Sequence, residues 1–164
     1  MVKENSEVAE QEGPSTRDRI KNVIQGPNIK ELAPFGGEDM AYFHSLEGQD
    51  GWIAMGSEFY KNSKYFTVLS ETGEKLGIIG VYDTDEEKNV AHVVVDQKFR
   101  GKGLAAKFYD QLMEKLGLPF ITLTIDLNNT ASIRAAEKLP GIKKTSDPQY
   151  ERRFHKVKYV YERK

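Results

Sequence analysis

The residues best suited to chemistry lie in the stretch DQKFRGKGLAA at positions 96–106, where a basic, glycine-rich turn follows an apolar run and precedes a helical pattern. Glycines just ahead of a helix let the backbone touch a ligand with no Cβ in the way. A helix N-terminus also presents unpaired N–H groups and the positive end of a dipole. Arg100 and Lys102 add positive charge. This combination predicts a phosphate-binding turn.

Two phosphate-binding patterns fit the same letters, and the first is that of a dinucleotide fold. Gly101, Gly103 and Ala106 satisfy G-x-G-x-x-G/A, and Asp126 ends the next apolar run, where a ribose ligand is expected. This interpretation predicts an NAD-dependent oxidoreductase. Against it, DQKFR separates the apolar run from the glycines, which in that fold follow the strand almost directly. The residues after Asp126 are also too few for the rest of a doubly wound sheet.

The segments around the turn predict the elements that position it. Residues 64–96 read as three antiparallel strands joined by the turn-rich links ETGEK and DTDEEKN. Large apolar residues recur at i, i+4 spacing over 104–116, which predicts a helix that ends at Gly117. Strands at 90–95 and 120–126 flank this helix. They should be parallel neighbours joined by a crossover.

The remaining segments complete the expected order β-α-α-β-β-β-α-β-α-β-β. They are a strand at 27–35, helices at 40–46 and 51–62, a short helix at 128–139, strands at 142–147 and 154–163, and a helical pattern at 16–25. We expect a single mixed, mostly antiparallel sheet with helices on both faces, which is an α/β (α+β) fold class. Residues 1–16 are expected to form a flexible arm, and residues 17–164 the one domain.

Composition narrows the functional classes. Hydrophobic residues make up 38% of the 164 residues and charged residues 30%, as in ordinary globular proteins, and the net charge is −1. We therefore expect neither a nucleic-acid nor a membrane partner, and no apolar run approaches the roughly 20 residues of a membrane span. The absence of cysteine excludes thiolate chemistry and suits a cytoplasmic location. Scattered histidines give no metal signature, and we expect a monomer or a homodimer.

Arg100, Gly103 and Ala105 also spell R-x-x-G-x-A, which resembles the Q/R-x-x-G-x-G/A signature of the GNAT superfamily of N-acetyltransferases. VVVDQKFRGKGLAAKFYDQLMEKL is similar to the family's fourth strand, pyrophosphate loop and third helix. LTIDLNNTASIRAAEKLPGIKK is similar to its fifth strand and fourth helix. The resemblance covers residues 28–164, and its specific part is 91–143. It implies the acyl-CoA N-acyltransferase (GNAT) fold and transfer of an acetyl group from acetyl-CoA to a primary amine.

In this family acetyl-CoA lies in a V-shaped gap where the fourth and fifth strands part. The resemblance implies that the pantetheine arm pairs with the backbone of the VVV run and that the pyrophosphate rests on the amides of the turn. An asparagine at the start of the fourth helix, and a polar residue three positions later, would contact the pantetheine. No metal is implied. The residues that take these roles are Val93, Val94, Val95, Arg100, Gly101, Lys102, Gly103, Leu104, Ala105, Ala106, Asn129 and Ser132.

The resemblance also implies a direct mechanism, in which a neutral amine attacks the thioester. A base must take a proton from the amine, and a backbone N–H of the fourth strand would hold the oxyanion. We predict His92 and Asp126 as the catalytic residues. His155, at the start of the last expected strand, is a further candidate base. Strand alternation places His92 and Val94 on the same face of the sheet.

The sequence departs from the family at the acid that would protonate the leaving thiolate. Many members carry a tyrosine seven residues after the asparagine of the fourth helix, and that position is Ala136 here. Tyr150, Tyr159 and Tyr161, in the expected final strands, are candidate substitutes. The departure leaves a second function open, that of a CoA-sensing protein of this fold with little transferase activity.

The acceptor is the least defined part of the expected reaction. It can be a small-molecule amine or a protein amine. Its pocket should be formed by the first two helices and the final hairpin, where Tyr42, Trp52 and Phe59 are candidate lining residues.

Overall fold

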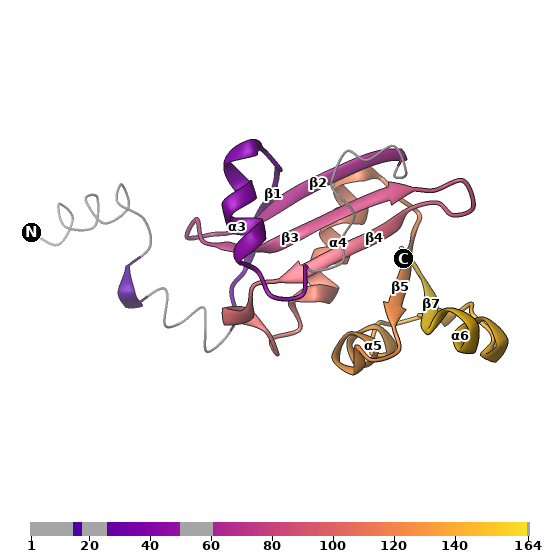
Figure 1. Cartoon of the computed structure of the whole chain (residues 1–164). Helices are drawn as coiled ribbons and strands as arrows, with labels where there is room; N and C mark the ends of the chain where they lie inside the picture. The colour runs from indigo at the N-terminus through magenta and orange to yellow at the C-terminus, as the bar shows by residue number, and fades with distance from the viewer. Residues whose placement is uncertain (1–14, 18–25, 50–60, 164) are drawn as a thin grey trace, which may run out of the picture.

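The computed structural model describes residues 15–17, 26–49 and 61–163 (Figure 1). In these ranges, seven strands form a single sheet with the order β1-β2-β3-β4-β5-β7-β6. Their bounds are Ile29–Pro34 for β1, Lys61–Ser70 for β2, Lys75–Asp83 for β3, Val90–Val95 for β4, Phe120–Asp126 for β5, Lys143–Lys144 for β6 and Lys156–Glu162 for β7. The pair β4 and β5 is parallel, and the other paired strands are antiparallel.

This sheet confirms the expected mixed, mostly antiparallel architecture. It does not have the parallel winding that the dinucleotide interpretation needs. Helices and 3-10 turns connect the strands of the described part of the chain. They are η1 (Gly37–Asp39), α3 (Met40–Ser45), η2 (Gln97–Phe99), α4 (Leu104–Leu116), α5 (Thr130–Glu137) and α6 (Pro148–Phe154).

The helices cover both faces of the sheet, because alternate residues of the strands are apolar on both sides. On one face α4 buries Leu104, Phe108 and Leu112, which are spaced four apart, in the main core together with residues such as Ile79. On the other face Phe43, from α3, lies in a smaller cluster with Leu46, Ile78 and Val94. The neighbours Ile78 and Ile79 therefore face opposite layers, which confirms the expected two-sided arrangement (Figure 1).

The chain between β5 and β7 differs from expectation. The strand expected at 142–147 is reduced to β6, and residues 148–154 form α6, which was not expected. Asp147 caps this helix, since its carboxylate accepts a hydrogen bond from the Tyr150 N–H at 2.7 Å, and Pro148 occupies the first turn. Tyr150 is therefore on a helix and not on a final strand, and β7 starts two residues later than expected.

Several expectations fall outside the described residues. They concern the arm at 1–16 apart from its last two residues, the helical pattern at 16–25 beyond its first two residues, and the helix at 51–62 with Trp52 and Phe59. The last two residues of that expected helix, Lys61 and Asn62, are described, and they open β2 because Lys61 is in register with Asp83 of β3. No helix of the described ranges is long and apolar enough to cross a membrane.

Candidate functional site

The two parallel strands part soon after they meet. β4 and β5 are in register at a single position, Val90 with Thr122, where the Thr122 N–H donates to the carbonyl of Asn89 at 2.8 Å. Beyond this point the strands diverge (Figure 1), while β4 remains paired with β3 and β5 with β7. The fourth and fifth strands therefore part, as the resemblance implies.

The backbone of β4 beyond Val90 is turned alternately toward β3 and toward this gap. In an extended strand the N–H and C=O of one residue point to the same side, and the sides alternate along the chain. The carbonyl of Asn89 faces β5, so the backbone groups of Val93 and Val95 face the gap as well. Val94 faces β3, with which it is in register. Val93 and the N–H of Val95 are thus the positions where an extended ligand could add to the edge of β4, since the Val95 carbonyl accepts a hydrogen bond from Arg100 Nε.

The turn between η2 and α4 has the backbone that close approach to a ligand requires. Gly101 and Gly103 have φ angles of 79° and 73°, a left-handed conformation that residues with a side chain rarely adopt. Apart from the adjacent residues, no atom of the described part of the chain lies within 4 Å of the position that a Cβ would take at either glycine. Gly103 is the N-cap of α4, so its open side adjoins the first turn of the helix. The predicted anion-binding turn therefore has both the geometry and the room it needs.

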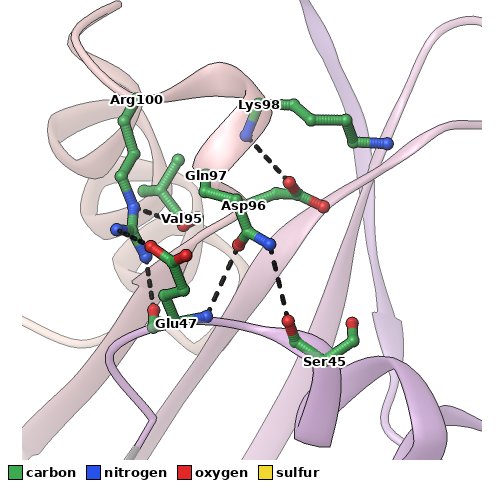
Figure 2. Close-up of polar contacts among 7 residues, drawn as sticks. All are labelled: Ser45, Glu47, Val95, Asp96, Gln97, Lys98 and Arg100. Carbon is green, nitrogen blue, oxygen red and sulfur yellow. Dashed lines mark hydrogen bonds and ion pairs between the residues drawn. The ribbon is translucent and has the colours of Figure 1, made fainter.

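The side chain of Arg100 is directed to the segment after α3 (Figure 2). Its Nε donates to the carbonyl oxygen of Val95 at 3.1 Å, and its Nη2 donates to the backbone carbonyl of Glu47. Nη1 also lies 3.5 Å from the Glu47 carboxylate. Arg100, which is expected to reach the phosphates, has a guanidinium that ties the turn to another segment of the protein.

Gln97 makes a second tie between the same two segments (Figure 2). Its side chain accepts a bond from the Glu47 N–H and donates one to the carbonyl of Ser45, both at 3.4 Å. Nearby, the buried carboxylate of Asp96 accepts the Lys98 N–H at 3.0 Å and the Tyr42 hydroxyl at 2.9 Å. Tyr42, expected in an acceptor pocket, instead fastens α3 to the start of the turn.

At the other side of the gap, Asn129 caps α5. Its side-chain oxygen accepts a hydrogen bond from the Ser132 N–H at 3.2 Å. The side chain of Asn129 is exposed. The two predicted pantetheine contacts therefore lie at the accessible first turn of the helix that follows β5.

His92 lies on β4, on the same face of the sheet as Val94 and opposite the main core. Its Nδ1 is 2.9 Å from the hydroxyl of Tyr65, and its ring lies 4.7 Å from that of Tyr82, centroid to centroid. Burial, and secondly the positive charge of Lys156, lower the pKa of His92 to about 4. Burial therefore keeps the imidazole neutral at physiological pH and also makes it a weaker base than an ordinary histidine.

The other two candidate bases take part in local turns. The carboxylate of Asp126 is exposed and accepts the Asn128 N–H at 2.8 Å in the turn that leads to α5. No hydrogen bond or ion pair joins it to His92 in the described part of the chain. His155 is exposed and is the left-handed C-cap of α6, with φ 55°. The structure therefore does not bring the predicted pair His92 and Asp126 into contact.

The candidate acids are engaged elsewhere. The Tyr159 hydroxyl donates to Glu137 at 3.1 Å and the Tyr161 hydroxyl to Asp110 at 2.7 Å. Burial, followed by these carboxylates, raises the pKa of each phenol to about 12. Ala136, at the position of the family's tyrosine, is 3% exposed and belongs to the main core.

Sequence analysis missed Tyr65 and Gly80. The residues Tyr65, Gly80 and His92 are in register on the adjacent strands β2, β3 and β4. Their relation depends on strand register across three segments, and no local motif signals it. The described residues hold no group of three or more His, Cys, Asp or Glu side chains that could bind a metal.

Comparison with known sequences gives one family. A family model described as an acetyltransferase (GNAT) domain matches residues 25–140, a range that includes β1 to β5, α4 and α5. The sequence has no match among curated proteins.

Solved structures with a similar fold include the spermidine N-acetyltransferase of Vibrio cholerae in complex with CoA and spermine. It has 11% sequence identity and a TM-score of 0.60 over 82% of this chain and 95% of that chain. The spermidine/spermine N-acetyltransferase of Vibrio cholerae in complex with manganese ions has 12% identity and a TM-score of 0.59 over 82% and 92%. A chimera from Vibrio cholerae and hSSAT has 14% identity and a TM-score of 0.59 over 81% and 94%. At these identities the likeness shows the fold.

Proposed function

Because this chain belongs to the acetyltransferase (GNAT) family, whose members transfer an acetyl group from acetyl-CoA to an amine, we propose that the gap between β4 and β5 holds acetyl-CoA. The parting of the two strands after Val90 and Thr122 carries this proposal. It leaves the backbone edge of β4 beside the glycine turn that opens α4. An extended pantetheine can pair with Val93 and Val95, and the pyrophosphate can rest on the amides from Gly101 to Ala106.

The roles of the predicted cofactor-binding residues differ within this site. The backbone of Val94 faces β3, so Val94 supports the edge without pairing with the ligand. Lys102 supplies positive charge to the phosphates, and the Arg100 side chain holds the turn in place. Asn129 and Ser132 present the first turn of α5 to the opposite side of the pantetheine.

The transfer requires a neutral amine at the thioester carbon. In the proposed step the amine nitrogen forms a bond to that carbon, a backbone N–H of β4 holds the oxyanion, and the C–S bond then breaks. His92 accepts the proton that the amine loses, because its ring lies on the face of β4 opposite the main core. Tyr159 and Tyr161 each donate to a carboxylate, so the thiolate takes its proton from water.

The acceptor face of the sheet carries two features that bear on the amine. Thr124 has a buried Oγ1 with no hydrogen-bond partner in the described part of the chain, and it shares a sheet face with Thr122 and Asp126. Lys156 lies close enough to His92 to lower its pKa, so positive charge stands near the proposed point of attack. That charge favours the neutral, nucleophilic form of an amine.

Ligand-dependent thermal unfolding tests the cofactor assignment. A ligand at about 100 times its dissociation constant adds about 2.7 kcal/mol to the stability of the native state, which raises the melting temperature by several degrees. Acetyl-CoA and CoA should each give this shift and NAD should not. A shift with NAD alone would reverse the choice between the two phosphate-binding patterns.

A transfer assay separates an acetyltransferase from a CoA-sensing protein of the same fold. The amine panel should contain spermidine, an aminoglycoside, free amino acids and a lysine peptide, since an amine acceptor of small-molecule or protein origin is proposed. Release of CoA that depends on one amine class identifies the acceptor, whereas CoA binding without transfer to any of them favours the sensing role. We place the reaction in the cytoplasm, because a chain without cysteine suits a reducing compartment.

A further inference from the structure

A tyrosine on β2 reaches the histidine on β4 across the strand between them. Tyr65 is opposite Gly80 in the β2–β3 pair, and Gly80 is opposite His92 in the β3–β4 pair. The Tyr65 hydroxyl lies 2.9 Å from His92 Nδ1. Side chains on next-nearest strands are normally held apart by the side chain between them, so this contact depends on what stands in the middle position.

Gly80 provides that space. A Cβ built on it would lie 2.1 Å from Cδ2 and 2.3 Å from Cε2 of the Tyr65 ring, far inside contact distance. The ring therefore lies directly over the backbone of Gly80, and the strand on its far side holds His92. No left-handed backbone requires this glycine, because Gly80 is not among the glycines with positive φ. Its lack of a side chain leaves room for the Tyr65 ring to cross β3 and contact His92.

From this geometry we propose that Tyr65 is a positioning residue, whose phenol oxygen accepts the Nδ1–H of His92 and so fixes the tautomer that carries a lone pair on Nε2. The inference rests on the proposed role of His92 as the base. A neutral imidazole carries one N–H, so a proton held at Nδ1 leaves Nε2 as the basic atom. The proton taken from the amine then enters at Nε2, while the C–N bond forms and the thiolate leaves.

Among the described residues, the titratable groups placed against His92 include Tyr65 on β2, Tyr82 on β3 and Lys156 on β7. Asp126, at the end of β5 on the same sheet face, bonds to its own turn. The Tyr65 hydroxyl is within hydrogen-bond distance of Nδ1 and is therefore placed to orient the ring.

The test combines imidazole NMR with kinetics on the full chain. The sequence contains three histidines, so the ring nitrogens of His92 can be assigned in a long-range 15N–1H spectrum by comparison with His92→Asn. In the wild type we expect the Nδ1–H tautomer at neutral pH. In Tyr65→Phe we expect a mixture of tautomers, a kcat lowered about tenfold, and an unchanged KM for acetyl-CoA.

Tyr82→Phe is the matched control, because it removes a hydroxyl from the other tyrosine ring against His92 without removing the Nδ1 contact. It should keep both the wild-type tautomer and the wild-type kcat. Gly80→Ala provides a second route, since the added methyl displaces the Tyr65 ring, and its spectrum should resemble that of Tyr65→Phe.

Each contrary outcome has a distinct meaning. Two results would overturn the role of Tyr65 and leave His92 as the base. One is an Nε2–H tautomer in the wild type. The other is an unchanged kcat in Tyr65→Phe while His92→Asn loses activity. A His92→Asn variant with full kcat overturns the base assignment itself, and the positioning role with it. The acetyl-CoA site is tested separately by ligand binding in each variant.

Discussion

The guanidinium of Arg100 is bonded to Glu47, a residue 53 positions earlier in the chain, through both its backbone carbonyl and its carboxylate (Figure 2). The first residue of the phosphate-binding signature therefore joins the glycine turn to the segment that follows α3. Since α3 itself lies on the opposite face of the sheet from α4, this bond links segments adjoining the two layers.

We predict that Arg100→Ala lowers the free energy of unfolding by about 1 kcal/mol, because an exposed tie of this kind contributes little more. Arg100→Lys should behave in the same way, since a lysine lacks the fork of donors that holds two carbonyls and a carboxylate. The dissociation constant for CoA should change by less than about threefold, as the tether leaves the turn's own amides in place. Urea unfolding and calorimetric titration measure the two quantities.

Lys102→Ala is the matched comparison, because it removes the other cation of the same turn. It should lower the affinity for CoA more than Arg100→Ala does. The size of this loss should depend on the salt concentration. The opposite result would be a tenfold loss of CoA affinity in Arg100→Ala with no loss in Lys102→Ala. It would mean that the guanidinium leaves Glu47 and binds phosphate when CoA is present.

Gly103 and Gly117 stand at the two ends of α4 and allow a controlled test of the anion site. Both have a left-handed backbone, with φ angles of 73° and 65°, and both have open space beside the Cα. Glutamate at either position should therefore cost a similar backbone strain of about 1 kcal/mol. Only Gly103→Glu should raise the dissociation constant for CoA, by about 100-fold or more, because its side chain and charge would occupy the pyrophosphate position. Equal CoA affinity in the two variants would remove the turn from the site.

The turn and the crossover could be predicted from sequence because their signals are local. Two glycines between an apolar run and an i, i+4 pattern mark the start of α4, and they fall where the structure has left-handed residues. The parallel pairing of β4 and β5 followed from the helix between them. The helix α6 was missed for an opposite reason, since its start signal at Asp147 and Pro148 stood between two segments that alternate like strands.

The side-chain contacts of His92, Asp126 and Arg100 could not be predicted from local sequence patterns. The contact of Tyr65 with His92 requires two strand registers and a small residue between them, and sequence periodicity sets neither register. Asp126 was predicted as a catalytic residue at the end of the fifth strand, and in the structure its carboxylate bonds to the turn that follows. The Arg100 tie likewise depends on the packing of α3, which is distant in sequence.

The lowered pKa of His92 predicts a pH dependence of stability. Its folded-state pKa of about 4 lies below the value of 6.5 for an unfolded chain. The folded state therefore favours the neutral ring, so this contribution is fully present above pH 6.5 and is lost as the pH falls toward 4. At pH 5 the loss should be about 2 kcal/mol.

Urea unfolding at pH 7 and pH 5, for the wild type and for His92→Asn, measures this effect. Asparagine does not titrate, so the variant should lose less stability between the two pH values, and the difference isolates His92 from the carboxylates. Equal losses in both proteins would mean that the ring titrates normally and can be protonated at pH 5.

The last prediction concerns the missing acid. Tyr159 and Tyr161 lie on the same strand and face, and each donates its hydroxyl proton to a carboxylate on a helix, Glu137 on α5 and Asp110 on α4. With a pKa of about 12, neither phenol is suited to protonate a thiolate. Tyr159→Phe and Tyr161→Phe should each lower the free energy of unfolding by about 1–2 kcal/mol through the lost hydrogen bond. Both should keep kcat within about threefold of the wild type, because neither residue acts in the proton transfer. A much larger loss of kcat in Tyr159→Phe alone, with unchanged affinity for acetyl-CoA, would identify Tyr159 as the acid that replaces the tyrosine absent at Ala136.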